Sequence, residues 1–330
     1  MTFHNEVDYM ENIKVGVIGV GHLGMHHARV YTEILGANLA GVVDIDEERA
    51  RAVADPLGVP AFTDIEAFIK NKKPDALSIV VPTSRHYEIA KTAMEHGVHV
   101  LIEKPVTTSV EEAEKLLQLA VAKNLILQVG HIERFNSAVQ HVREFIKDPY
   151  FIQTRRMGPF SPRISDVGVV LDLMIHDVDI ILSMINSELV SISAMGSCIL
   201  TDHEDIASAQ LRFANGAMAQ ILVSRVSEKR CRLMEITEPE RYVTVNYEAQ
   251  DISVQRCVRQ SGGNIVEVME HPVFPKTEPL KMELQHFVAC VRDGKQPMVG
   301  IKDGKRALEV CVAALRQIHD SNSKQQLLAI

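Results

Sequence analysis

No apolar run in this 330-residue chain reaches the roughly 18 residues that a membrane-spanning helix needs. The N-terminal segment MTFHNEVDYMENIK also lacks the basic and apolar regions of a secretion signal. The chain has fewer basic than acidic side chains, 35 Lys and Arg compared with 43 Asp and Glu, which gives a net charge of −8. This balance argues against a nucleic-acid surface, which needs clustered Lys and Arg. We therefore expect a cytoplasmic protein with no membrane or nucleic-acid partner.

Cysteine is sparse and irregularly spaced. The five cysteines follow neither a CxxC pattern nor the Cys/His spacing of a zinc site: Cys198, Cys231, Cys257, Cys290 and Cys311. The sequence therefore predicts neither a disulfide framework nor a metal site, and it fits a reducing compartment. Internal repeats and low-complexity segments are absent as well.

What is present is the composition of a globular enzyme, with 46% hydrophobic and 24% charged residues. Single hydrophobic cores stop growing at about 250 to 300 residues. Because this chain is longer, we expect two domains, the first over residues 12–130 and the second over residues 131–330.

Residues 12–130 alternate apolar strand-like runs with amphipathic stretches. The strand-like runs are KVGVIGV, LAGVVDI, ALSIVVP, HVLIEKP and LILQVGH. This alternation predicts an α/β fold of the Rossmann type, in which a parallel sheet carries helices on both faces. Ligands of such sheets bind at the carboxyl ends of the strands, so the residues that directly follow each run are candidates for the site.

Residues 131–330 have a different period. Alternating and β-branched runs such as FIQTRRMG and VSISAMGSCIL predict an α+β domain with an open, mostly antiparallel sheet. Asn215-Gly216 and Ser261-Gly262-Gly263-Asn264 predict hairpins, and helices are expected over about residues 169–184 and 305–321. Helices would cover one face of the sheet and leave the other to pair with a second copy, which predicts a homodimer or homotetramer.

Three glycines follow the first strand-like run. Gly19, Gly21 and Gly24 have the GxGxxG spacing between a strand and an amphipathic stretch, which is the context that gives this motif its meaning. Gly19 permits a tight turn, Gly21 lets the backbone approach a pyrophosphate, and Gly24 lets the helix pack closely on the strand. His22 and Leu23 lie in the same loop and are expected to line the cofactor.

Asp44 follows the second strand-like run, at the distance at which dinucleotide-binding proteins carry a ribose-binding carboxylate. It would accept hydrogen bonds from the adenosine ribose hydroxyls and repel a 2′-phosphate, and no neighbouring Arg is expected to absorb that charge. NAD is therefore predicted over NADP. The alternative is a parallel-sheet protein with a glycine turn and a solvated Asp.

The segment HVLIEKPVTTS places Glu103, Lys104 and Pro105 directly after the fifth strand-like run. Glu103 and Lys104 are therefore expected to contact the cofactor. The side chain of Lys104 would then point into the crevice where a nicotinamide lies, and its ammonium could polarise a hydroxyl or carbonyl. The alternative is a lysine at the rim with a solvated head group.

A second group of polar residues lies in DLMIHDVD, within the helix expected after residue 169. Asp172 and His176 are four residues apart, so on a helix the carboxylate can orient and tune the imidazole. His176 could then accept a hydroxyl proton as the carbon-bound hydride leaves. A structural salt bridge fits this spacing equally well, whereas a metal site lacks an identifiable third ligand.

Together, the glycine loop, EKP at residues 103–105, GHIERFN at 130–136 and DLMIHDVD at 172–179 resemble the glucose-fructose oxidoreductase and inositol dehydrogenase (Gfo/Idh/MocA) family over nearly the whole chain. The resemblance implies an NAD(P)-dependent dehydrogenase of sugars or cyclitols. It makes Lys104 the family's catalytic-site lysine, and Asp172 and His176 the pair that handles the substrate. Thr83 and His86 match the loop along the cofactor.

Within the family, GHIERFNSAV and the segment RRMGPFSPRISDVGVVLDLMIHDVD are most similar to enzymes that oxidise UDP-N-acetylglucosamine, or a close relative, at the 3-hydroxyl. Asn136 is placed in the substrate site by this resemblance. Guanidinium forks suit a diphosphate, and the candidates are arginines that precede the DLMIHDVD helix: Arg134, Arg155, Arg156 and Arg163, with Arg156 and Arg163 favoured. Two positions depart from these relatives: a glycine cluster is reduced to Gly168, and Ser137 stands where relatives often have Pro.

The resemblance thus implies NAD-dependent oxidation of a UDP-sugar. In this reaction His176 would be the base, Lys104 would stabilise the developing charge, and Asp172 would orient His176 or bond a ring hydroxyl; Lys104 and His176 could exchange roles. By resemblance, a 3-keto product would supply an aminotransferase on a route to lipid A or other surface glycans. A myo-inositol 2-dehydrogenase is the alternative enzyme. An NAD(H)-sensing regulator without turnover is the alternative of another class, although a sensor has no need of a base.

Overall fold

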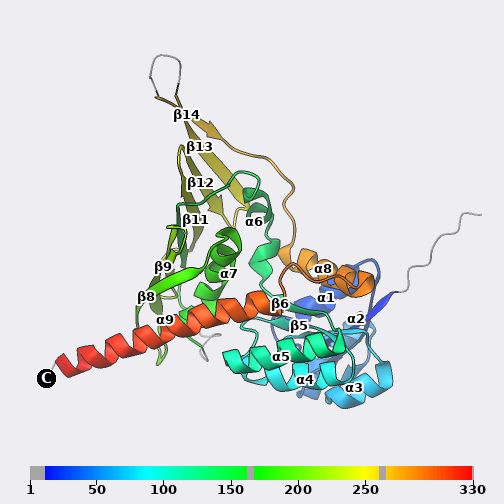
Figure 1. Cartoon of the computed structure of the whole chain (residues 1–330). Helices are drawn as coiled ribbons and strands as arrows, with labels where there is room; N and C mark the ends of the chain where they lie inside the picture. Colours follow the sequence, from blue (N-terminus) through cyan, green and yellow to red (C-terminus); the bar gives the residue numbers. More distant parts are fainter. Residues whose placement is uncertain (1–11, 162–166, 260–264, 329–330) are drawn as a thin grey trace, which may run out of the picture. The chain divides into compact units, whose positions relative to one another are not determined.

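The computed structural model describes residues 12–161, 167–259 and 265–328. The chain forms two compact units (Figure 1). One contains the chain up to Gly130 together with Leu280–Ile301, and the other contains His131–Pro279 together with the residues from Lys302 onward. The structure thus differs from the predicted division in one segment, because Leu280–Ile301 returns to the first unit.

The first unit is a parallel six-stranded sheet in the order β3-β2-β1-β4-β5-β6, the arrangement of dinucleotide-binding folds. Its strands are β1 (Ile13–Ile18), β2 (Ala37–Val43), β3 (Ala61–Phe62), β4 (Ala76–Ile79), β5 (His99–Glu103) and β6 (Leu127–Gly130). The central strands are mostly apolar and buried, because helices cover both faces of the sheet.

The helices of the first unit lie on both faces of this sheet (Figure 1). They are α1 (Gly24–Glu33), α2 (Glu47–Leu57), α3 (Ile65–Lys72), α4 (His86–Glu95), α5 (Val110–Lys123) and α8 (Pro279–Asp293). The last of these explains the difference in domain division. Leu284 and Phe287 of α8 are fully buried, the Gln128 side chain donates to the Glu283 carbonyl, and Val129 N–H donates to the Val299 carbonyl at the edge of β6.

The second unit is built on an eight-stranded sheet in the order β14-β13-β12-β11-β7-β10-β9-β8, in which all neighbours are antiparallel except β7 and β10. Its strands are β7 (Phe151–Met157), β8 (Leu189–Ser197), β9 (Ile206–Phe213), β10 (Met218–Ser224), β11 (Cys231–Glu238), β12 (Arg241–Asn246), β13 (Asp251–Arg259) and β14 (Ile265–Glu270). The predicted fold class, a Rossmann unit plus an α+β unit with an open sheet, is confirmed.

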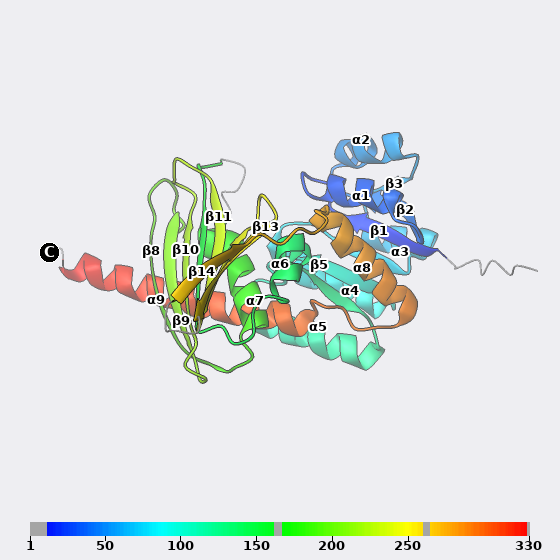
Figure 2. The same cartoon turned by 90° about the horizontal axis from the view of Figure 1, so that it is seen from above.

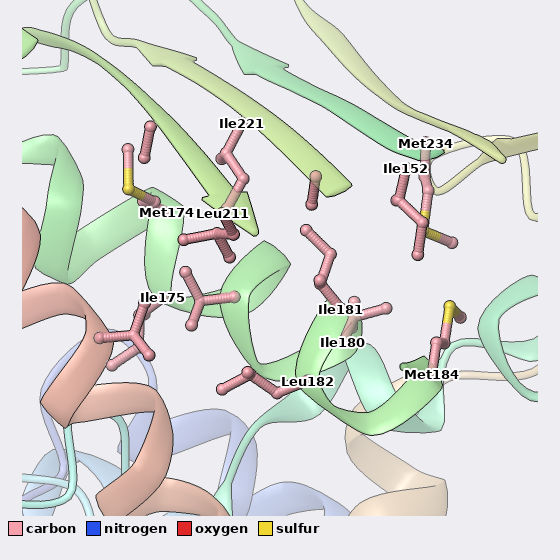
Figure 3. Close-up of a cluster of buried hydrophobic side chains, with 14 of the residues drawn as sticks. Ile152, Met174, Ile175, Ile180, Ile181, Leu182, Met184, Leu211, Ile221 and Met234 are labelled. Carbon is pink, nitrogen blue, oxygen red and sulfur yellow. The ribbon is translucent and has the colours of Figure 1, made fainter. Parts of the chain in front are cut away.

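Helices cover one face of the second sheet (Figure 2). They are α6 (Ser137–Val142), a π-helical segment (Val170–Met174) that continues into α7 (Ile175–Met184), and α9 (Ile301–Leu328). Figure 3 shows Ile181 and Met184 of α7 among the sheet residues Ile152, Ile221 and Met234. This packing holds α7 against one face of the sheet and so fixes the position of the polar side chains on the helix.

The two hairpin predictions have different outcomes. Gly216 has φ +89° between the antiparallel strands β9 and β10, as the Asn215-Gly216 turn requires. The Ser261–Asn264 turn lies outside the described residues, although the flanking β13 and β14 pair antiparallel. The described helices include none that combines the length and apolar character needed to cross a membrane.

Candidate functional site

The glycine loop has the geometry that a bound pyrophosphate needs. Gly19 has φ +83°, and a Cβ there would collide with the carbonyl of Val80. A Cβ on Gly24 would collide with the carbonyl of Gly19, so the helix start packs on the turn without a side chain between them. At Gly21, in contrast, a Cβ would meet no described atom within 4 Å. The open space at Gly21 is the place where a dinucleotide phosphate would approach the backbone.

Helix α1 begins at Gly24 with Leu23 at its N-cap, and no side chain caps it. The first N–H groups of a helix have no partner within the helix and attract anions. This uncapped helix start, next to the space at Gly21, fits the diphosphate of NAD, with His22 and Leu23 in the loop between them.

Asp44 lies at the end of β2 with its carboxylate buried against the glycine loop. Its Oδ2 accepts a hydrogen bond from Val20 N–H at 2.9 Å, and its Oδ1 accepts one from Asp46 N–H at 3.0 Å. The expectation that no arginine lies nearby is wrong, because Arg49 Nη1 is 3.3 Å from Asp44 Oδ1. Arg49 also pairs with Asp46, so one guanidinium faces two carboxylates and a 2′-phosphate would still meet net negative charge.

Lys104 and Pro105 follow β5 and are joined by a cis peptide bond. The Glu103 carboxylate is buried and accepts a hydrogen bond from Lys104 N–H at 3.2 Å. Its other oxygen lies 3.2 Å from Nε2 of His27, a fully buried residue of α1. Glu103 therefore fixes the backbone at Lys104. The structure thus gives Glu103 a supporting position, and its contact with the cofactor stays a prediction.

His86 has a similar supporting position. It is buried at the start of α4, where Nδ1 lies 2.8 Å from the Pro105 carbonyl and Nε2 lies 2.9 Å from the Val81 carbonyl. Burial lowers the pKa of His86, although the two carbonyls oppose this shift. The imidazole thus joins the segment after β4 to the EKP segment. Thr83 lies in the 3-10 turn Thr83–Arg85 beside it and is half-buried.

In the second unit, Asp172 lies in the π-helical segment and His176 in the first turn of α7. The sequence predicts a regular α-helix here, and the structure differs because residues 170–174 carry the wider π turn. Such turns are rare and recur at functional sites. Both side chains are half-buried, so each reaches solvent-accessible space, and their catalytic roles stay predictions.

The predicted anion-binding arginines have protein partners. Arg134 Nη1 lies 3.3 Å from Asp179 of α7. Arg156 donates two hydrogen bonds to Asp177, at 3.0 and 3.1 Å, and one to Glu133 at 2.7 Å. Burial opposes its charge, but Asp177 and Glu133 raise the pKa of Arg156 well above its ordinary value. The arginine is therefore held charged inside the fold.

The remaining predicted substrate residues are Arg155, Asn136 and Arg163, and each has a different environment or lies outside the described residues. Arg155 lies 3.1 Å from Glu235 on the neighbouring strand β11. Asn136 is buried; it caps α6 by accepting from Ala138 N–H and donates to the Tyr247 carbonyl at 2.9 Å, and its contact with the substrate stays a prediction. Arg163 lies outside the described residues.

A cavity of about 180 Å³ in the second unit contains residues that the sequence did not single out. Its walls include Asp172 and Arg156, together with Arg225, Arg230 and Arg232. Arg230 directly precedes β11, and Arg232 is the second residue of this strand. Both are far from DLMIHDVD in sequence, and the register of the strands brings them to the same cavity as Asp172. The described residues contain no group of three or more His, Cys, Asp or Glu side chains suited to a metal ion.

Comparison with known proteins agrees with this architecture. The family described as "Oxidoreductase family, NAD-binding Rossmann fold" matches residues 13–131, and "GFO/IDH/MocA C-terminal domain" matches residues 129–242. The UDP-N-acetylglucosamine 3-dehydrogenase of Acidithiobacillus ferrooxidans is 37% identical over 93% of this chain and 96% of its own length. The scyllo-inositol 2-dehydrogenase (NAD(+)) of Bacillus subtilis is 29% identical over 92% of this chain and 93% of its own length.

A solved structure of the Acidithiobacillus ferrooxidans enzyme superposes with a TM-score of 0.87 and 35% identity, covering 94% of this chain and 98% of that one. The similarity extends over both units, and the dinucleotide fingerprint has the required geometry. The chain therefore belongs to the Gfo/Idh/MocA family of NAD-binding oxidoreductases.

Proposed function

We propose that this enzyme oxidises the 3-hydroxyl of UDP-N-acetylglucosamine, or of a close UDP-sugar, to the 3-keto sugar. The observation that carries the proposal is the 37% identity, over nearly the full length of both chains, to an enzyme of that name. The arginine-lined cavity beside Asp172 supports it, because a nucleotide sugar brings a diphosphate that a free cyclitol lacks.

The roles of the chain's own residues follow from acid–base chemistry. His176 accepts the proton of the 3-hydroxyl, and the Lys104 ammonium stabilises the charge that develops on that oxygen. Asp172 orients His176 or bonds a ring hydroxyl. The Gly19–Gly24 loop and Asp44 hold NAD, which when bound accepts the hydride from the sugar carbon.

The test is to incubate the purified protein with NAD and UDP-N-acetylglucosamine and to follow the absorbance of reduced nicotinamide. A coupled aminotransferase removes the ketone, so that the reverse reaction does not mask turnover. Parallel reactions with free myo-inositol test the alternative favoured by the similarity to inositol dehydrogenases. Turnover of inositol without a nucleotide, or NAD binding without turnover of either compound, would contradict the proposal.

We also propose that the enzyme acts in the cytoplasm as a homodimer or homotetramer, and that its product supplies an aminotransferase on a route to 3-amino sugars of lipid A or other surface glycans. Exposed apolar side chains on β8, Val190 and Met195, support pairing of the open sheet with a second copy. Light scattering after size-exclusion chromatography measures the oligomer. A monomer at micromolar concentration would contradict the assembly.

A further inference from the structure

The cavity beside Asp172 is strongly cationic in a protein whose net charge is −8. Four of its wall residues are arginines and one is an aspartate: Arg156, Arg225, Arg230, Arg232 and Asp172. All of them belong to the second unit. A concentration of guanidinium groups around a cavity is the arrangement that recognises phosphate oxygens.

Two of the four arginines are occupied by the fold. Arg156 is bound to Asp177 and Glu133 as described above. Arg225 donates to Asp205 at 2.6 Å, to the Val167 carbonyl at 2.8 Å and to Thr201 Oγ1 at 2.7 Å. These guanidiniums already have strong partners, so they line the cavity mainly as structural elements.

Arg230 and Arg232 have much weaker partners. Their shortest separations from a described carboxylate are 3.9 and 3.8 Å, both to the same oxygen, Glu248 Oε1. These distances exceed hydrogen-bond length. One carboxylate oxygen at that range leaves most of the N–H groups of two guanidiniums available to a ligand.

The strand register places like charges opposite each other at this cavity. Arg232 on β11 pairs directly with Arg156 on β7, so two guanidiniums lie opposite each other on the same face of the sheet. Like charges in such positions destabilise a sheet. Burial lowers the pKa of Arg232, as do the positive charges of Arg156 and Arg230, although Glu133 and Glu248 oppose this shift. A bound anion would relieve both effects.

We propose that Arg230 and Arg232 bind the diphosphate of the nucleotide sugar and thereby select it over unphosphorylated sugars and cyclitols. This inference rests on the proposed function, since it assigns the substrate's diphosphate to the cavity that contains Asp172. The planar guanidinium fork explains why arginine rather than lysine occupies both positions, because it can bind two phosphate oxygens at once.

The experiment compares Arg230→Gln, Arg232→Gln and the double variant with Arg256→Gln. Arg256 is the matched control because its side chain is 37% exposed, like that of Arg232, and lies on the same sheet, but it pairs with Glu270.

Each cavity variant is expected to raise the KM for UDP-N-acetylglucosamine about ten- to a hundredfold, the usual range for a hydrogen bond to a charged group. The kcat and the KM for NAD should change less than twofold, and Arg256→Gln should behave as wild type. Arg230 is 65% exposed, so its variant is expected to fold even if Arg232→Gln does not.

A second measurement does not depend on turnover. Calorimetric titration of the NAD-loaded protein with UDP and with inorganic pyrophosphate should show binding that the two cavity variants lose and Arg256→Gln retains. If the enzyme oxidises UDP-N-acetylglucosamine and the cavity variants keep the wild-type KM, the diphosphate site is wrong and the function stands. If no sugar is oxidised but binding of UDP depends on Arg230 and Arg232, the site stands and the function fails. Absence of UDP and pyrophosphate binding in the wild type overturns the site.

Discussion

The two units present anion-binding groups by different means. In the first unit the backbone does so: a turn at Gly19, open space at Gly21 and an uncapped helix start at Gly24. In the second unit side chains do so, since Arg230 and Arg232 extend from the start of β11 into a cavity. The backbone site depends on neighbouring residues, whereas the side-chain site depends on the pairing of distant strands. The first is therefore readable from sequence, and the second is not.

The prediction with the largest expected effect concerns two substitutions, one in each unit, and tests whether both units contribute to catalysis. Lys104→Ala in the first unit and His176→Ala in the second should each lower kcat at least ~100-fold, the lower end of acid–base contributions. The dissociation constant for NAD should stay within about twofold, because neither residue belongs to the glycine loop. Steady-state kinetics and calorimetric NAD titration measure the two quantities.

Lys123→Ala is the control for this pair, since its ammonium donates to the Glu95 carbonyl on the surface of the first unit. Its kcat should equal that of the wild type. If only one of the two site variants loses activity, the proton handling belongs to a single unit and the proposed division of roles is wrong.

The contrast between the units explains which features the sequence predicts. The glycine loop, Asp44 and the alternation of strands and helices follow from adjacent residues, and the structure has them. Helix α8 was not predicted as part of the first unit, because nothing near residue 280 indicates that Leu284 and Phe287 become buried there or that the Glu283 carbonyl accepts a hydrogen bond from Gln128 of β6. Arg49 is different: it lies in the first turn after Asp46, the N-cap of α2, and a helical reading of that segment would have placed it beside Asp44.

The sequence singled out arginines for the substrate site of the second unit, but it could not say which arginines the fold leaves available. Arg156 was favoured for the substrate, and the structure places it against Asp177 and Glu133. Asp177 reaches it from α7 and Glu133 from the 3-10 turn Ile132–Phe135, and periodicity specifies neither contact. The cavity arginines Arg230 and Arg232 were not singled out, because their position opposite Arg156 depends on the register between β7 and β11.

The next prediction separates two functions of the glycine loop, the close packing at Gly24 and the space for the cofactor at Gly21. Gly24→Ala should destabilise the fold by about 1–3 kcal/mol, because its Cβ would press on the backbone carbonyl of Gly19, which cannot rotate away. Gly21→Ala should unfold like the wild type, since its Cβ enters open space, yet it should weaken NAD binding by occupying the place of the pyrophosphate. Thermal unfolding and NAD titration of both variants measure this. Equal stability of the two variants would contradict the packing role of Gly24.

Asp44→Asn is expected to have a smaller effect, about tenfold on the ratio of NAD to NADP affinity. The amide keeps the shape of the side chain but removes the charge that opposes a 2′-phosphate, and it releases Arg49 to bind that group. Asp46→Asn is the control, because it also removes a charge paired with Arg49 while an asparagine can still cap α2. Kinetics with both cofactors measure the ratio. A larger shift in Asp46→Asn than in Asp44→Asn would contradict the assignment of Asp44 to the ribose.

The smallest effect concerns a buried acid of the first unit. Glu283 of α8 is fully buried, and neither of its carboxylate oxygens has a hydrogen-bond partner among the described residues. Burial, and then the charge of Glu103, raise the pKa of Glu283 well above its ordinary value, which favours the neutral form in the folded protein. Its stability contribution is complete below the ordinary pKa of Glu and is lost as the pH rises toward the folded pKa, because the unfolded chain releases the proton first.

Glu283→Gln should therefore become more stable than the wild type by an increment that grows as the pH rises above the ordinary pKa of Glu, and the two proteins should converge below it. Urea unfolding of both proteins across this pH range measures the increment, and Glu278→Gln, a substitution just before the start of the same helix, is the control. An increment that does not change with pH would mean that Glu283 is ionised in the folded protein. The buried carboxyl would then be charged like Asp177 and Asp179 of the second unit, which arginines pair, and the contrast between an unpaired neutral acid in one unit and ion-paired carboxylates in the other would no longer hold.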